Sequence, residues 1–116
     1  MVLQKDNIKL KKEFDLVYRK GKNLSGRFFI LRVFFQKDSQ EKTRFGVVVS
    51  LKVSNKAVVR NRKRRQLKEI IRLSQKRINP GYLCLITAKK EIVDIEYDDL
   101  NKEFIYLCKK AGILKQ

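Results

Sequence analysis

The sequence contains no histidine, no tryptophan and only one proline among its 116 residues. The absence of histidine excludes histidine acid–base catalysis, Ser-His-Asp triads and histidine-ligated metals. Acidic residues are also scarce, because 12 Asp and Glu stand against 29 Lys and Arg, which gives a formal net charge of +17. Charge of one sign in such excess repels itself in a compact fold, so we expect a polyanionic partner.

Long apolar runs are missing as well, since no stretch of 18 consecutive apolar residues occurs. We therefore expect no membrane-spanning helix. Residues 1–6 form no apolar signal segment, and we expect the protein to be cytoplasmic. In that reducing compartment Cys84 and Cys108 are expected to fill the core as thiols rather than to form a disulfide. The four ligands of a zinc site are not available.

The positive charge is unevenly distributed along the chain. Residues 1–51 carry a net charge of +7, residues 52–77 carry +10 with Glu69 as their only acid, and residues 78–116 are neutral overall. The last third therefore reads as fold-building sequence, and the electrostatic function is assigned to the first two thirds. Because there is no repeat and no linker composition, we expect one domain over residues 1–116.

Apolar spacing predicts the element order α-β-β-α-β-α, which is an α+β fold of two layers. The first two predicted strands are expected to form a hairpin with each other. The last predicted strand is apolar throughout, which suits a central position covered on both faces. The predicted helices cover residues 9–19, a segment from a cap at Ser54 or Asn55 to about Ile78, and residues 97–110, and the predicted strands cover residues 28–35, 44–53 and 82–88.

The central predicted helix has one apolar stripe and one basic face. Arg60 and Lys63 fall in line with the apolar stripe, so we expect the first turns to project beyond the sheet with cations all round. A row of like charges at every fourth position, from Lys52 to Lys76, costs about a few tenths of a kcal/mol per pair unless phosphates neutralise it. Polyanion binding is therefore favoured over a solvated face. The stripe consists of Leu67, Ile70, Ile71, Ser74 and Ile78, and the basic face of Arg62, Arg65, Lys68, Arg72 and Lys76.

This helix resembles the Arg-Asn-Arg helix of the protein subunit of bacterial ribonuclease P. The resemblance rests on the segment Lys56-Ala57-Val58-Val59-Arg60-Asn61-Arg62-Lys63-Arg64-Arg65-Gln66-Leu67-Lys68-Glu69. The order of the surrounding features strengthens it: a first helix that ends at Gly21, a strand Arg44-Phe45-Gly46-Val47 that leads to Val49-Ser50, and then the motif. The resemblance extends from about residue 5 to residue 113.

The resemblance implies a small α/β sandwich with a left-handed βαβ crossover, an exception to the usual handedness. It also implies that the protein has no active site of its own and is inactive alone. A catalytic RNA with bound Mg²⁺ would hydrolyse precursor tRNA, remove the 5′ leader and leave the mature 5′ end. The protein would bind ribonuclease P RNA and grip the leader, with no membrane and no protein partner required.

Site residues are carried over position by position. Arg32 stands where some members have an aromatic residue, so a phosphate contact would replace base stacking there. Lys63 stands where many members have Ile, and Leu51 replaces a Lys, which leaves Lys52 alone. The resemblance assigns Lys56, Arg60, Asn61, Arg62, Arg64, Arg65 and Lys68 to the catalytic RNA, and Phe14, Tyr18, Arg32 and Lys52 to the leader.

Several alternatives remain open at this stage. Phe14 and Tyr18, four residues apart on one helix face, are also ordinary core candidates, and the Asn61 amide could bridge two arginines instead of binding RNA. A small ribosomal protein would share the charge and fold class, and a basic helix also suits a DNA groove. A protein-only nuclease would need a magnesium site. The candidates for it are Glu91, Asp94, Glu96, Asp98 and Asp99.

Overall fold

The structure is a computed structural model that describes residues 11–115. Residues 9 and 10 of the first predicted helix lie outside this range. The helices are α1 (Lys11–Lys20), α2 (Ala57–Ser74) and α3 (Tyr97–Ala111), with short 3₁₀ helices η1 (Gln75–Arg77) and η2 (Lys90–Asp94). The strands are β1 (Lys22–Ser25), β2 (Phe29–Phe35), β3 (Arg44–Val48) and β4 (Tyr82–Ala88).

The four strands form one mixed sheet in the order β1-β2-β4-β3. The predicted hairpin is wrong, because β4 lies between the two strands that were expected to pair. It is antiparallel to β2 and parallel to β3. The central position predicted for β4 is confirmed, and a central strand requires two neighbours. The prediction also missed β1, whose only buried residue is Leu24, and extended β3 beyond its end at Val48.

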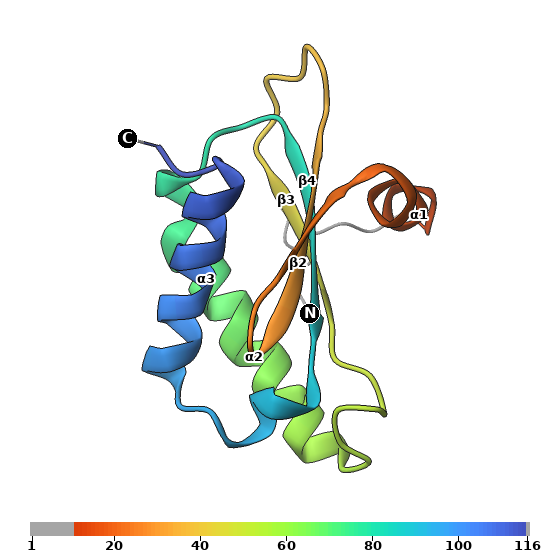
Figure 1. Cartoon of the computed structure of the whole chain (residues 1–116), viewed down its shortest axis with the longest axis vertical. Coiled ribbons are helices and arrows are strands. Elements are labelled where there is room, and N and C mark those ends of the chain that lie inside the picture. Colours follow the sequence, from red (N-terminus) through yellow and green to blue (C-terminus); the bar gives the residue numbers. More distant parts are fainter. Residues whose placement is uncertain (1–10, 116) are drawn as a thin grey trace.

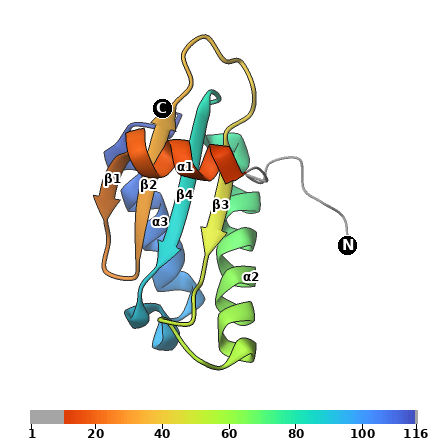
Figure 2. The same cartoon turned by 90° about the vertical axis from the view of Figure 1, so that its right-hand side faces the viewer.

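The two faces of the sheet are covered differently. Helices α2 and α3 pack side by side on one face, whereas α1 crosses the other face alone (Figures 1 and 2). The main core lies beneath α2 and α3 and includes Phe29, Phe45 and Phe104, all almost fully buried. A smaller cluster lies between α1 and the sheet and consists of Val17 of α1 with Leu83 and Leu85 of β4. The α+β prediction of a sheet with a helical layer is confirmed, and α1 is an addition on the second face.

Helix α2 connects two neighbouring parallel strands, β3 and β4. The apolar stripe predicted for it is confirmed, since Leu67, Ile70, Ile71 and Ser74 of the helix, together with Ile78 after it, are buried. The predicted cap is wrong. The N-cap is Lys56 without a side-chain bond, and the Ser54 hydroxyl oxygen accepts the Lys56 N–H at 3.1 Å, one residue before the helix. The left-handed sense of this crossover stays a prediction.

The expectation that the first turns of α2 project beyond the sheet is wrong at Lys63. This side chain is only 3% exposed, and its Nζ donates a hydrogen bond of 2.6 Å to the carbonyl oxygen of Ile95. The segment around η2 therefore covers this side of α2, and the aliphatic stem of Lys63 occupies a place normally filled by an apolar residue. Burial lowers the pKa of Lys63, and the neighbouring Arg62 charge lowers it further.

The two cysteines lie in the main core as predicted. Cys84 on β4 and Cys108 on α3 are buried free thiols. Burial raises the pKa of Cys84 well above its ordinary value and that of Cys108 to about 12. Neither thiol is therefore poised as a nucleophile. Within residues 11–115, no helix combines the length and apolar composition needed to cross a bilayer.

Candidate nucleic-acid interface

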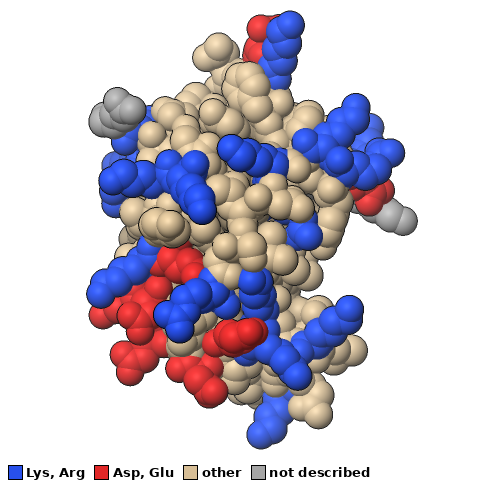
Figure 3. Space-filling view, in the orientation of Figure 1, with Lys and Arg blue, Asp and Glu red and all other residues tan. Residues whose placement is uncertain are grey.

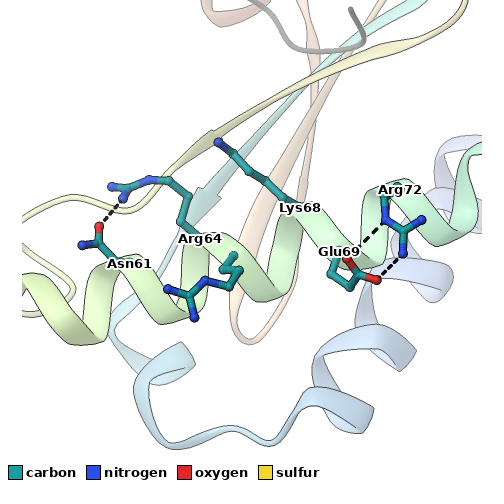
Figure 4. A pocket seen from close by; sticks show the side chains of 6 residues that line it. Asn61, Arg64, Lys68, Glu69 and Arg72 are labelled. Carbon is teal, nitrogen blue, oxygen red and sulfur yellow. Dashed lines mark hydrogen bonds and ion pairs between the residues drawn. The ribbon is translucent and has the colours of Figure 1, made fainter. Parts of the chain in front are cut away.

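The basic face of α2 forms a shallow hollow of about 340 Å³ (Figure 4). Five basic or amide side chains and one acid line it, in keeping with the charge excess of this segment. From α2, Arg64 and Lys68 extend toward the chain that carries β3. The lining residues, which we call the α2 hollow, are Asn61, Arg64, Arg65, Lys68, Glu69 and Arg72.

Hydrogen bonds within the protein orient part of this hollow. The Arg64 guanidinium donates to Asn61 Oδ1 at 2.8 Å and to the Val49 carbonyl oxygen at 3.2 Å. Asn61 thus orients one arginine rather than bridging two. Arg72 donates to Glu69 at 2.5 and 3.2 Å, and this hydrogen bonding lowers the pKa of the Glu69 carboxyl. The single acid of the hollow is therefore neutralised by a cation beside it.

Other cations of this face lack a protein partner. Within residues 11–115, the side chains of Arg62, Arg65 and Lys68 form no hydrogen bond or ion pair. Arg62 and Arg65 are exposed, and Lys68 is half-buried. Arg60, in contrast, donates to the Ser54 carbonyl oxygen at 2.9 Å. Unpaired cations beside a hollow can bind phosphate oxygens without first breaking an ion pair.

The second group of predicted residues meets on the face crossed by α1. The guanidinium carbon of Arg32 lies 4.5 Å from the centre of the Tyr18 ring, which is a cation–π contact. Arg32 Nη1 also donates to the Thr87 hydroxyl at 3.0 Å, while its buried Nε has no partner among the described residues. The tyrosine remains 46% exposed. The structure thus brings together Tyr18 of α1 and Arg32 of β2.

Within residues 11–115, no helix covers one part of this sheet face. Helix α1 crosses the strands near one end, and no other helix of the described chain lies over the opposite end (Figure 2). Successive side chains on a strand point to opposite faces, and the strand register aligns Ile30 and Val48 with Thr87. All three are half-buried, as is Arg32. We call Ile30, Arg32, Val48 and Thr87 the open sheet face.

Phe14 has a different role from Tyr18. A Cβ at Gly46 would lie 3.0 Å from the Phe14 ring, so the phenylalanine packs directly over this glycine. The absence of a side chain at Gly46 therefore permits this close packing of α1 on β3. A bidentate ion pair between Glu13 and Arg44 fixes the same end of α1 to β3. Phe14 is therefore an anchor of α1, and Tyr18 is the aromatic residue left available for a ligand.

The two remaining predicted positions, Lys56 and Lys52, lie in different parts of the structure. Lys56 is exposed at the N-cap of α2. Lys52 is exposed in the turn that follows β3, at the end of the sheet where Val48 lies. Sequence reasoning missed Thr87, which positions Arg32, and the Glu13–Arg44 pair. Thr87 was detectable as the one aliphatic hydroxyl in a largely apolar strand, whereas nothing in the sequence indicated an ion pair 31 residues apart.

Most acidic side chains on the face seen in Figure 3 lie toward the end of the molecule where α3 begins, with several basic side chains beside them. Asp98 and Asp99 occupy the first turn of α3, where carboxylates interact favourably with the helix dipole. Within residues 11–115, no three His, Cys, Asp or Glu side chains come close enough to hold one metal ion.

Comparisons with known proteins identify the family of this chain. The model of the Ribonuclease P family matches residues 3–112. The ribonuclease P protein component of Clostridium botulinum strain Loch Maree is 39% identical over 112 residues, covering 96% of this chain and 98% of that protein. The component of Syntrophomonas wolfei is 33% identical over 113 residues, covering 97% and 92% of the two chains.

Solved structures show the same fold. The Staphylococcus aureus RNase P protein superposes with a TM-score of 0.85 at 22% identity, covering 97% of this chain and all of that one. The RNase P protein of Thermotoga maritima gives 0.80 at 23% identity, with 91% and 97% covered. The family model and the sequence relatives support ribonuclease P over a small ribosomal protein. The chain belongs to the ribonuclease P protein family, the protein components of a tRNA-processing ribonucleoprotein.

Proposed function

We propose that the α2 hollow, together with Arg62 on the same basic face of the helix, is the surface through which this chain assembles with a catalytic ribonuclease P RNA. The observation that carries the proposal is the set of unpaired cations Arg62, Arg65 and Lys68 on a face whose only acid, Glu69, is already paired. Phosphates bound there would relieve the repulsion between like charges along α2. Asn61 and Arg64, held by their mutual hydrogen bond, present donors in a fixed geometry. Lys56 and Arg60 extend this surface at the start of the helix.

We further propose that the 5′ leader of precursor tRNA binds on the open sheet face. Tyr18 supplies an exposed ring for a base, and Arg32 beneath it supplies charge for a phosphate. Lys52, at the end of the sheet away from α1, provides another phosphate contact. Stacking combined with cations along a backbone tolerates any base sequence. Such tolerance suits a leader whose sequence differs from one tRNA to another.

Hydrolysis itself is assigned to the RNA. Within the described residues the protein has no histidine base and no carboxylate set for a metal. Mg²⁺ would therefore be held mainly by RNA phosphates, and the protein would contribute binding and orientation. Under this proposal the chain is a subunit of an enzyme and is inactive alone. We also propose that it acts in the cytoplasm.

The assembly surface is tested by measuring the affinity for a bacterial ribonuclease P RNA over a range of salt concentrations. Each lost phosphate contact lowers the slope of log affinity against log salt by about 0.7 to 0.9. We expect Arg62→Ala/Arg65→Ala to lower it by between about one and two. The control Lys90→Ala/Lys102→Ala removes the same charge from exposed positions outside the α2 hollow. Equal changes in both variants would show that net charge alone matters.

A further inference from the structure

The α2 hollow does not end with the helix. A second hollow of about 660 Å³ begins at Arg72, which lines both. Its cations are Lys42, Arg72, Lys76 and Lys115. A third hollow, of about 370 Å³, shares Lys115 with the second and adds Arg77 and Lys109. The three hollows therefore form one connected series, which we call the basic track.

The basic track is almost free of negative charge. Among the described residues, none that line the second and third hollows is acidic. The acid of the first hollow, Glu69, is paired with Arg72. Apolar side chains line the basic track as well, Ile78 and Pro80 in the second hollow and Ile105 and Leu114 in the third. A hollow lined by several cations and by few acids is a surface suited to a polyanion.

Folding assembles this track from distant parts of the chain. Lys42 precedes β3, Lys76 and Arg77 follow α2, and Lys109 and Lys115 belong to the last third, which is neutral overall. Because the charges of that third balance, its composition does not indicate an electrostatic role. In the structure its acids lie mainly where α3 begins (Figure 3), and Lys109 lies near the end of the helix.

Backbone hydrogen bonds hold the end of the track in place. The Lys115 N–H donates to the Arg77 carbonyl oxygen at 2.7 Å, and the Asn79 N–H donates to the Ile113 carbonyl oxygen at 2.8 Å. An isolated bridge joins Ile78 to Leu114 between them. The fold thus fixes the chain that carries Lys115 against the chain that carries Arg77. Holding like charges close together is unfavourable unless an anion neutralises them.

We infer that the basic track binds the phosphate backbone of the catalytic RNA beyond the Arg-Asn-Arg end of α2, as far as Lys109 and Lys115. This inference rests on the proposed function, because it extends the same RNA contact. The 18 residues of α2 span about 27 Å. That length is about three Debye lengths at physiological salt. Cations at the two ends of the track therefore contact different phosphates and contribute independently to the salt dependence.

The test is the salt dependence of binding to a bacterial ribonuclease P RNA by the full chain. We expect Arg77→Ala/Lys109→Ala/Lys115→Ala to lower the logarithmic slope by about two. The control is Lys90→Ala/Lys102→Ala/Lys110→Ala, which removes the same charge from exposed positions outside the track and is expected to change the slope by less than about one. The charge-conserving variant Arg77→Lys/Lys109→Arg/Lys115→Arg is expected to restore the slope. Thermal unfolding of each variant checks that the fold persists.

The outcomes separate the inference from the proposed function. If the wild-type chain does not bind the RNA, the proposed function fails. If Arg62→Ala/Arg65→Ala weakens binding while the track variant behaves like its control, only the extension fails. The extension is also overturned if the track variant leaves RNA assembly unchanged and weakens only the binding of precursor tRNA to the assembled complex.

Discussion

The exposed ring of Tyr18 leads to a specific prediction about leader binding. The tyrosine is 46% exposed, with Arg32 against its ring at 4.5 Å. Replacing an aromatic residue that stacks on a base costs about 1–3 kcal/mol. Because Arg32 already occupies one face of the ring, only the other face is available, and we expect the lower part of that range, about 1–2 kcal/mol. This loss corresponds to about 5- to 30-fold weaker binding.

The assay compares two substrates on the assembled ribonucleoprotein. We expect Tyr18→Ala to weaken binding of precursor tRNA with a long leader by this factor and to leave leaderless tRNA unchanged. Assembly with the catalytic RNA should be unaffected, because Tyr18 lies outside the α2 hollow. The matched control is Tyr106→Ala. Tyr106 on α3 is also exposed, at 61%, with Lys110 over its ring at 6.0 Å.

Two results would refute this reasoning. An equal loss with leaderless tRNA would show that Tyr18 does not contact the leader. An equal loss in Tyr106→Ala would show that any exposed tyrosine beside a cation has the same effect. Phe14→Ala is not a suitable substitute for this test, since Phe14 packs over Gly46 and its loss would destabilise the position of α1.

Three further predictions concern stability. Burial lowers the pKa of Lys63 in the folded protein below 10.5, its value in the unfolded chain. Between these two pKa values the unfolded chain binds more protons than the folded protein. The contribution of Lys63 to stability therefore rises with pH up to about 10.5. The stability of Lys63→Met relative to the wild type, measured by urea unfolding, should therefore fall between pH 7 and 10, and parallel curves would contradict this. The Glu103 carboxylate accepts hydrogen bonds from the backbone N–H groups of Arg27 and Phe28 at 2.6 and 2.8 Å. Glu103→Gln should lower the free energy of unfolding by about 1–2 kcal/mol, which would appear as a lower Tm. An unchanged Tm would show that this turn does not depend on the charge. The thiols of Cys84 and Cys108 should react with iodoacetamide only at the rate of unfolding, and rapid modification of the native protein would contradict their burial.

Sequence patterns predicted the elements better than their pairing. The apolar run of β4 and the apolar stripe of α2 were correctly interpreted. A strand buried on both faces is apolar at nearly every position, and a helix buried on one face is apolar at helical spacing. The pairing of β2 with β3 was wrong because adjacency in the chain favours a hairpin, and nothing local shows that β4 inserts between them. Strand β1 escaped notice because it is short, polar and supported by a single buried side chain, Leu24.

The candidate site was predictable as a composition but not as a geometry. Their separation of four residues placed Phe14 and Tyr18 on one helix face. Only the structure shows that the Phe14 ring packs on Gly46 and that the Tyr18 ring stays exposed. Lys63 was expected in solvent because it is charged. Its Nζ instead reaches a backbone carbonyl 32 residues away, and no sequence periodicity records such a partner.

The most direct test of the account is cleavage of a 5′-labelled precursor tRNA at low Mg²⁺. Three samples are compared: the protein alone, a bacterial ribonuclease P RNA alone, and the two together. We expect leader removal only when both are present, because the protein supplies the binding surfaces and the RNA supplies the chemistry. Failure of the protein to stimulate the RNA would contradict the assembly proposed through the α2 hollow. Cleavage by the protein alone would contradict the assignment of hydrolysis to the RNA and redirect attention to the acidic residues at the start of α3.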